Sequence, residues 1–292
     1  MNARSRQGFA LLTALFALLV VSAVALDAAL RAQTERRAAW NLTVEVRERA
    51  AAWGGIAHAL RLLRELQARS VSTDGSDPSL FEEWNRVDTL LAGPVTLPGA
   101  GVYRVAIRDA ASRLGVNTAT ANELYRLFRM LGAEDGLARS VALGIVARRV
   151  AVAPFEALGP LRAVEGFAQL PHAVSEYLTV VGDGTVNLNT APEPVLQALP
   201  GLTSESVTWL LTRREAGAAV RGLSELAVGI AAPARRELEE HFAELEARTR
   251  FEPAALEIVA TGEVRGSRLR TVLRVVAARA GSTLQITRTF ER

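Results

Sequence analysis

The chain opens with MNARSRQG (residues 1–8), followed by FALLTALFALLVVSAVAL (residues 9–26). The second segment carries no charge, and its length is close to the ~20 residues that cross the hydrocarbon core of a bilayer as a helix. A helix satisfies every backbone hydrogen bond within the segment, as the bilayer requires. The arginines of the first segment favour leaving that end in the cytoplasm. The sequence therefore predicts a single-pass membrane helix with the bulk of the chain on the far side.

Two other interpretations compete for the same stretch. A secretory signal also has a basic start and an apolar region, and Ala23-Val24-Ala25 fits its small-residue cleavage pattern. A buried core helix is the other. Apolar residues, however, continue to recur at three- and four-residue steps beyond the run, at Val46, Ala50, Trp53, Leu60 and Leu63. This pattern favours one helix over about 9–69, roughly 90 Å long, with its membrane part at 9–26 and a bend at Gly54-Gly55.

The composition excludes several kinds of site. The chain has 292 residues and no cysteine, so a disulfide framework and a thiolate metal site are impossible. The net charge of +3 is modest, and arginine and glutamate interspersed on solvated helices explain it. The sequence contains no phosphate loop, no zinc-spaced histidine pair and no nucleophile elbow. We therefore predict that the protein is not an enzyme, and expect no cofactor from the residues themselves.

Strand patterns stand at both ends of the part that follows the helix. Residues 93–99 lead into 102–109, where large apolar residues alternate with polar or small ones, as in one strand of a hairpin. Three further strands are predicted near the C-terminus, at 256–264, 271–277 and 284–290. Between these two regions no strand signal of similar strength occurs. The sequence thus predicts an α+β fold, with one antiparallel sheet interrupted by an inserted helical domain.

The insert carries an internal repeat. One copy follows Val116-Asn117-Thr118-Ala119 and the other follows Asn187-Leu188-Asn189-Thr190-Ala191, with leucines, a glycine and an arginine pair at similar spacing in each. In this interpretation Thr118 and Thr190 cap helices, and Gly132 and Gly201 stand at turns into second helices. The side chains of Asn187 and Asn189 hydrogen-bond the local backbone and hold the turn that enters the next helix.

Each unit resembles the helix-hairpin-helix (SAM-like) module of nucleic-acid proteins. That module has a glycine-containing turn whose backbone amides approach a phosphate. Here Thr203 replaces the usual second glycine, and Glu134-Asp135 would repel a phosphate in the first copy. Arg213, Arg214 and Arg221 could contact a nucleic-acid backbone, although a solvated helix face explains them as well. A membrane-anchored DNA-binding protein of the competence-receptor type is therefore kept as the alternative function.

A basic leader ending in Gly8, a bulky apolar Phe9 and a continuous amphipathic helix are similar to a type IV prepilin N-terminus. Nearly the whole chain, from this leader to the last strand, resembles one subtype of that family, the K-type minor pseudopilins of type II secretion (general secretion pathway protein K, GspK). Most members of that wider family have a glutamate at the fifth mature position, and its replacement, here by Thr13, is typical of the K type. The string Val186-Asn187-Leu188-Asn189-Thr190-Ala191-Pro192 is similar to the N-x-N-T-A-P string found in this family.

The resemblance implies a division of the chain and a role. It implies cleavage by a prepilin peptidase between Gly8 and Phe9, with methylation of the new amino terminus. It also implies a single-pass inner-membrane protein with a cytoplasmic N-terminus and a periplasmic soluble part. The expected parts are a leader (1–8), a helix (9–69), a first sheet segment (70–115), an inserted α-helical domain (116–250, with repeats at about 116–170 and 185–245) and the C-terminal strands (251–292).

The resemblance further implies partners and a metal. The expected partners are I- and J-type minor pseudopilins, the peptidase, the secreted cargo and the outer-membrane secretin, and no nucleic acid. The expected function is to cap the tip of a periplasmic pseudopilus and to help initiate its assembly. Known members suggest calcium in the soluble domain, and Asp74, Asp77 and Asp183 are the candidate ligands. A solvated loop or turn is nevertheless the favoured interpretation of these aspartates.

Overall fold

The computed structural model describes residues 3–73, 77–99, 101–280 and 283–291, and within these ranges it does not describe the side chains of residues 3–13 and 291. It contains one long helix, a five-stranded sheet and a set of shorter helices.

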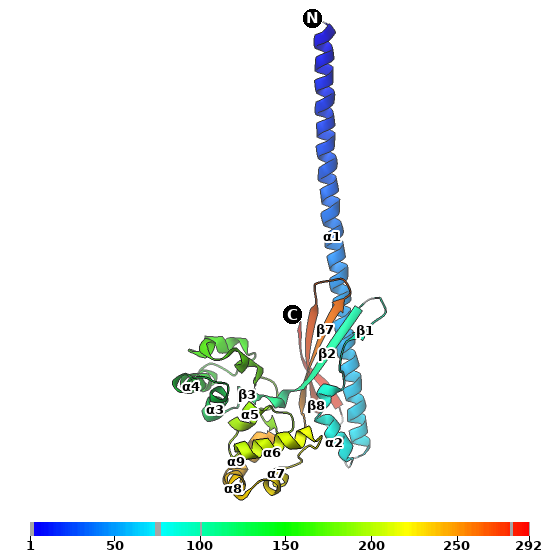
Figure 1. The fold of residues 1–292 in the computed structure, drawn as a ribbon. Coiled ribbons are helices and arrows are strands. Elements are labelled where there is room, and N and C mark those ends of the chain that lie inside the picture. The colour runs from blue at the N-terminus through cyan, green and yellow to red at the C-terminus, as the bar shows by residue number, and fades with distance from the viewer. Residues whose placement is uncertain (1–2, 74–76, 100, 281–282, 292) are drawn as a thin grey trace.

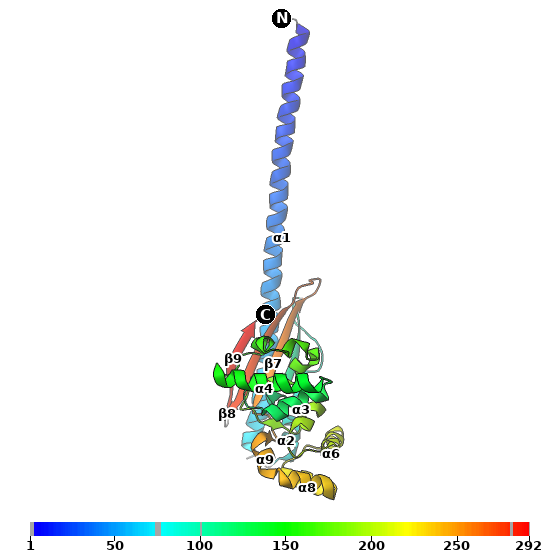
Figure 2. The same cartoon turned by 90° about the vertical axis from the view of Figure 1, so that its left-hand side faces the viewer.

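The first element is a single helix, α1 (Ala3–Ser72), of 70 residues. Figures 1 and 2 show its N-terminal half extending away from the rest of the molecule and its C-terminal half lying along the sheet. Near its end, the hydroxyl groups of Ser70, Ser72 and Thr73 donate to backbone carbonyl groups of the preceding turn. Such bonds compete with continuation of a helix. The expected long N-terminal helix is confirmed.

Close backbone contact holds α1 against the central strand β7 (Ala255–Val264). A Cβ atom added to Gly262 would lie 1.9 Å from the carbonyl oxygen of Glu48, and one added to Gly55 would lie 3.0 Å from the Val105 side chain. The glycines therefore allow the helix and the sheet to approach each other. Because α1 is continuous through Gly54-Gly55, with no sharp bend in Figures 1 and 2, the expected bend there is wrong.

The buried face of α1 differs in part from the predicted apolar stripe. Leu60 and Leu63 are buried as expected, whereas Val46, Ala50 and Trp53 are exposed. Small residues occupy the contact instead, because the backbones of α1 and β7 lie too close there to admit large side chains. The residues that fill this part of the contact are Ala51, Ala52, Gly55 and Ala59.

The sheet is antiparallel throughout, with the strand order β1-β2-β7-β8-β9. Its strands are β1 (Val95–Thr96), β2 (Gly101–Asp109), β7, β8 (Thr271–Ala280) and β9 (Thr283–Glu291). Alternate residues of β7 and β8, such as Ile258 and Leu273, point to α1 and share one hydrophobic core with it. Neighbouring strands β2 and β7 are far apart in sequence, so the helices between them form an insertion.

Two short elements follow α1 and lie beside it. They are α2 (Pro78–Trp84) and the 3₁₀ helix η1 (Val87–Thr89). Trp84 of α2 is buried in the core beneath the sheet, and its indole nitrogen donates to the Ser70 hydroxyl at 2.9 Å. This contact joins α2 to the C-terminal end of α1.

The inserted residues form a second lobe with its own hydrophobic core. Its helices are α3 (Ala121–Met130), α4 (Asp135–Ala151), α5 (Glu193–Ala198), α6 (Ser204–Glu215), α7 (Leu223–Gly229), α8 (Ala232–Glu240) and α9 (Phe242–Arg248). Short 3₁₀ helices also belong to this lobe: η2 (Ala110–Ser112), η3 (Gly159–Ala163), η4 (Phe167–Gln169) and η5 (His172–Glu176). Its strand pairs are parallel: β3 (Leu114–Gly115) with β4 (Leu178–Thr179), and β5 (Val186–Asn187) with β6 (Thr249–Arg250).

We call residues 110–250 the helical lobe, and residues 44–109 with 251–291 the sheet lobe. Figure 1 shows the helical lobe on the side of the sheet opposite α1, displaced toward the end of the molecule that is farthest from the N-terminus. The two lobes have separate hydrophobic cores. The predicted α+β class, with an antiparallel sheet interrupted by helices, is confirmed.

Candidate functional site

The N-terminal segment of α1 is exposed and apolar. One helix in the described part of the chain is long and apolar enough to cross a membrane, and its most apolar window lies near the N-terminus with none of its residues buried. Leu15, Phe16 and Leu19 are each at least 60% exposed, which leaves their apolar surface without a partner in the monomer. Gly8, Phe9 and Thr13 lie in the first turns of the same helix, and their side chains are outside the described part of the chain.

The repeat predicted from the sequence is present as a repeated set of contacts. Asn117 binds both backbone groups of Phe155: its Oδ1 accepts from the nitrogen at 2.7 Å and its Nδ2 donates to the oxygen at 2.9 Å. In the second copy Asn189 binds the nitrogen and the oxygen of Val220 in the same way, at 2.7 and 2.8 Å. Each asparagine thus connects the start of its unit to a segment after the second helix.

An arginine in the second helix of each copy makes the same kind of contact. Arg149 of α4 donates to the backbone oxygen of Ala119 at 2.7 Å, and Arg214 of α6 donates to that of Ala191. Burial lowers the pKa of both guanidinium groups, which are held among backbone carbonyl groups. These two arginines therefore serve the fold of each unit.

The two predicted helix caps are wrong, because the N-cap residue lies two positions later in each copy. The N-cap of α3 is Thr120, whose hydroxyl accepts from the Glu123 nitrogen while the Glu123 carboxylate accepts from the Thr120 nitrogen. Thr118 instead donates to the Gly115 carbonyl oxygen at 3.3 Å, within the turn that precedes the helix. The N-cap of α5 is Pro192, which offers no side-chain acceptor, and Thr190 faces Asp109. In both copies the backbone turns once more before the helix starts.

The predicted turn glycines lie between helices of each repeat. Gly132 has φ +91° in the connection from α3 to α4, and Gly201 has φ +72° in the connection from α5 to α6. A residue other than glycine would be strained at these positive φ angles.

Polar side chains join the two lobes at the end of β2. Asp109 is buried, and its Oδ2 accepts from Asn187 and from Thr190, each at 2.7 Å, while its Oδ1 accepts from the Ala111 nitrogen at 2.9 Å. Burial raises the pKa of Asp109, and the bonds from Thr190, Asn187 and Ala111 act in the opposite direction. The Nδ2 of Asn187 also donates to Asn85, which follows α2. The string around Asn187 is therefore part of the junction between the lobes.

The sequence predicts the local contact of this arrangement but not the contacts between the lobes. As expected, the Asn187 side chain accepts from the backbone nitrogen of Asn189 at 3.0 Å and holds the local turn. The contacts with Asp109 and Asn85 were missed, because nothing in the sequence pattern brings residues from the other lobe beside this turn.

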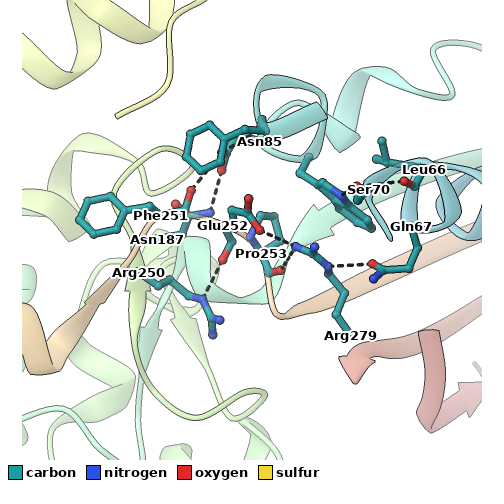
Figure 3. A network of polar contacts seen from close by, with 12 residues as sticks. Leu66, Gln67, Ser70, Asn85, Asn187, Arg250, Phe251, Glu252, Pro253 and Arg279 are labelled. Carbon is teal, nitrogen blue, oxygen red and sulfur yellow. Dashed lines mark hydrogen bonds and ion pairs between the residues drawn. The ribbon is translucent and has the colours of Figure 1, made fainter. Parts of the chain in front are cut away.

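A second group of polar contacts lies next to the junction (Figure 3). Arg279 of β8 donates to Gln67 of α1 at 3.1 Å and to both Glu252 and the Pro253 backbone oxygen at 3.0 Å. Its guanidinium carbon also lies 3.9 Å from the centre of the Trp84 ring. Residues 250–253 lead the chain back from the helical lobe into β7, so Arg279 fixes this return to the sheet lobe.

The candidate calcium ligands are used within their own turns. Asp77 accepts from the hydroxyl and the nitrogen of Ser79, at 2.7 and 2.9 Å, and these bonds lower its pKa. Asp183 accepts from the hydroxyl and nitrogen of Thr185 and pairs with Arg250 at 3.2 Å, a cation that opposes binding of a metal ion. Asp74 lies outside the described residues. Among the residues that are described, no group of three or more histidine, aspartate or glutamate side chains could hold a metal ion, and calcium remains a prediction of the resemblance.

The surfaces that a helix-hairpin-helix module offers to phosphate are occupied by the protein itself. At the start of α4, the Glu134 carboxylate accepts from the nitrogens of Gly136 and Leu137, and these bonds lower its pKa. At the other turn, a Cβ atom on Gly201 would lie 2.8 Å from His241, so α8 and its following residue cover the turn.

The three arginines considered for nucleic acid are engaged as well. Arg213 pairs with Glu225, Arg214 donates to the Ala191 oxygen, and Arg221 lies over the Phe81 ring. The geometry gives no support to nucleic-acid binding through these modules.

Comparisons with known proteins support one of the two resemblances at the level of the fold. No protein-family model matches the sequence, and the search of curated proteins gives no match. A chain of the crystal structure of the GspK–GspI–GspJ complex from the type 2 secretion system of enterotoxigenic Escherichia coli is similar, with a TM-score of 0.54 and 14% sequence identity. The likeness covers 80% of this chain and 98% of that chain. The protein therefore shares its fold with a chain of that type 2 secretion complex.

Proposed function

We propose that the protein is a K-type minor pseudopilin of a type II secretion system, which caps the tip of the periplasmic pseudopilus and helps initiate its assembly. The observation that carries the proposal is the arrangement of one chain: an exposed apolar helix continues into a sheet, and a helical lobe is inserted between β2 and β7. A chain from a complex of three such secretion proteins shares this fold over nearly its whole length.

The proposed mechanism is packing of the apolar helix, first in the membrane and then in the filament. Residues 9–26 hold the precursor in the inner membrane, with the N-terminus in the cytoplasm and both lobes in the periplasm. The prepilin peptidase cuts between Gly8 and Phe9 and methylates the new amino terminus. The apolar surface of α1 then packs against helices of I- and J-type minor pseudopilins as the filament leaves the membrane.

Thr13 suits a subunit that starts the filament. A carboxylate at this depth in the membrane would be costly unless a neighbouring amino group met it. A threonine hydroxyl can donate to a backbone carbonyl group of its own helix instead. The first subunit therefore needs no earlier neighbour at this position.

The proposal assigns no catalytic step to the protein. The two lobes remain outside the membrane as a bulky head, which would contact the secreted cargo and the outer-membrane secretin. The alternative, a membrane-anchored DNA receptor, has no observation in its favour, because Glu134 and His241 cover the surfaces that would meet a phosphate.

Mass analysis of the N-terminus tests the proposal. The full chain is recovered from membranes of cells with and without a prepilin peptidase. We expect a methylated Phe9 terminus only when the enzyme is present, and an unprocessed chain when Gly8 is replaced by a bulky residue. Gly54→Ala, far from the cleavage position, is the matched control. Export of the cognate secreted protein should fail in the Gly8 variant. The proposal fails if that variant supports processing and secretion as the wild type does.

A further inference from the structure

Two adjoining cavities lie on the outer face of the sheet, the face turned away from α1. The first has a volume of about 1080 Å³ and lies beside β1, β2 and the turn from β7 to β8. The second, of about 870 Å³, lies between β8, β9 and residues 156–158 and 179–181 of the helical lobe. Arg270 lines both cavities, and we call the two together the outer-face groove.

The sheet-side wall of the outer-face groove combines the apolar ring of Phe290 with the charged side chain of Arg274. The strand register places Arg274 of β8 between Val259 of β7 and Phe290 of β9, and all three point to the outer face. Phe290 remains 45% exposed. Leu158 and Val180 line the opposite wall from the helical lobe. An aliphatic side chain that entered between these walls would bury apolar surface on both sides.

The groove also carries an excess of positive charge. Arg104 and Arg113 on this face each have a carboxylate partner, Glu263 at 2.9 Å and Glu257 at 2.7 Å. Other arginines line the groove without an ion pair to any residue that the structure describes: Arg265, Arg268, Arg270 and Arg274. Glu156 is the further carboxylate on the lining, so the unpaired positive charges outnumber the negative one.

We infer that the outer-face groove binds an extended, acidic segment of another polypeptide, in which carboxylate side chains alternate with aliphatic ones. The carboxylates would meet the unpaired arginines, and the aliphatic side chains would enter between Phe290 and the helical lobe. A nucleic acid fits the groove less well, because it has no aliphatic side chain to enter between Phe290 and the helical lobe. The inference uses only the chemistry of this surface and does not depend on the proposed pseudopilin role.

A direct binding measurement tests the inference. The full chain in detergent micelles is titrated into a fluorescein-labelled peptide of alternating glutamate and leucine or valine, and fluorescence anisotropy reports binding. Empty micelles are the blank. We expect saturable binding that weakens as salt is added. The same peptide with lysine in place of each glutamate should not bind.

Paired variants locate the binding. Arg270→Glu with Arg274→Glu should weaken the peptide by roughly tenfold or more, since attraction becomes repulsion at two positions. Arg64→Glu with Arg236→Glu changes the net charge equally at exposed positions outside the groove and should have little effect. Phe290→Ser should also weaken binding, which attraction by charge alone would not explain. Equal affinity of the two double variants, or displacement of the peptide by short duplex DNA, would overturn the inference.

Discussion

At the scale of single residues, the junction between the lobes depends on Asp109, a buried carboxyl group of the sheet lobe that accepts hydrogen bonds from donors of the helical lobe. Three donors satisfy its oxygens, yet burial still raises the pKa of Asp109 above its ordinary value. The folded protein therefore holds this proton more tightly than the unfolded chain does. The stability that Asp109 contributes is present below the unfolded pKa of about 3.9 and is lost as the pH rises through the folded value.

The direction of this pH dependence gives the first prediction. Asp109→Asn cannot titrate, so the free energy of unfolding of the wild type minus that of the variant should fall as the pH rises from about 4 toward neutrality. Contributions from all other carboxyl groups cancel in this difference. Urea unfolding followed by tryptophan fluorescence at several pH values measures it. A difference that is constant or increases with pH would show that Asp109 is not held in a proton-retaining site.

The repeated asparagine gives a second prediction at this scale. Asn189→Ala would leave the nitrogen and oxygen of Val220 and the oxygen of Phe251 without their side-chain partner in a buried place. We expect a loss of roughly 3 kcal/mol in the free energy of unfolding, because each unsatisfied buried group is costly. Asn122→Ala, at an exposed position on α3, should stay within about 0.5 kcal/mol of the wild type. Similar losses in the two variants would contradict the assigned role of Asn189.

Residue-scale contacts could be predicted from the sequence only where both partners are close along the chain. The turn bond between Asn187 and Asn189 follows from local propensity, and so does the placing of Gly132 and Gly201 between helices. The cap of α3 is misplaced because Thr118 and Thr120 both stand shortly before the helix, and only the extra backbone turn decides between them. Asp109 carries no local signal at all, since its partners come from the other lobe.

At the scale of elements, the packing of α1 on the sheet depends on two glycines, one on the helix facing the sheet and one on the sheet facing the helix. Gly55 of α1 approaches β2 and β7, and Gly262 of β7 approaches the backbone of α1 at Glu48 and Ala52. The period of the apolar residues was enough to predict the helix. Its buried face could not be read from the same pattern, because close backbone contact favours alanine and glycine over Val46 and Trp53.

A pair of glycine substitutions tests this packing. Gly262→Ala should destabilise the protein by about 3 kcal/mol, because the added methyl group has no room beside the Glu48 carbonyl and α1 must move away from β7. Gly54→Ala has its nearest side-chain atom 3.8 Å away, and should raise the free energy of unfolding by up to about 1 kcal/mol through helix propensity. Denaturant unfolding of both variants is the measurement. A tolerated Gly262→Ala would show that the helix is not held as closely as described.

At the scale of the whole molecule, the division into a helix, a sheet and an inserted helical part followed from the order of periodic patterns along the chain. Strand-like alternation at both ends of the soluble part required an insertion, and β2 and β7 do pair as neighbours. The relative placement of the lobes, and with it the part of the outer-face groove that lies between them, could not be derived in this way. Both depend on how two separate cores meet through Asn85, Asp109 and Asn187.

The exposed apolar half of α1 allows a prediction for the intact protein. Val20 lies near the middle of the apolar segment and is exposed, and a charge at the centre of a membrane helix costs about 3 kcal/mol. Val20→Arg should therefore lower the fraction of the protein that stays in the membrane after alkaline extraction. Trp40→Arg places the same charge on an exposed part of α1 outside that segment and should change nothing. If both variants remained in the membrane to the same extent as the wild type, α1 would not be the anchor, and the apolar surface around Leu15 and Phe16 would require another partner.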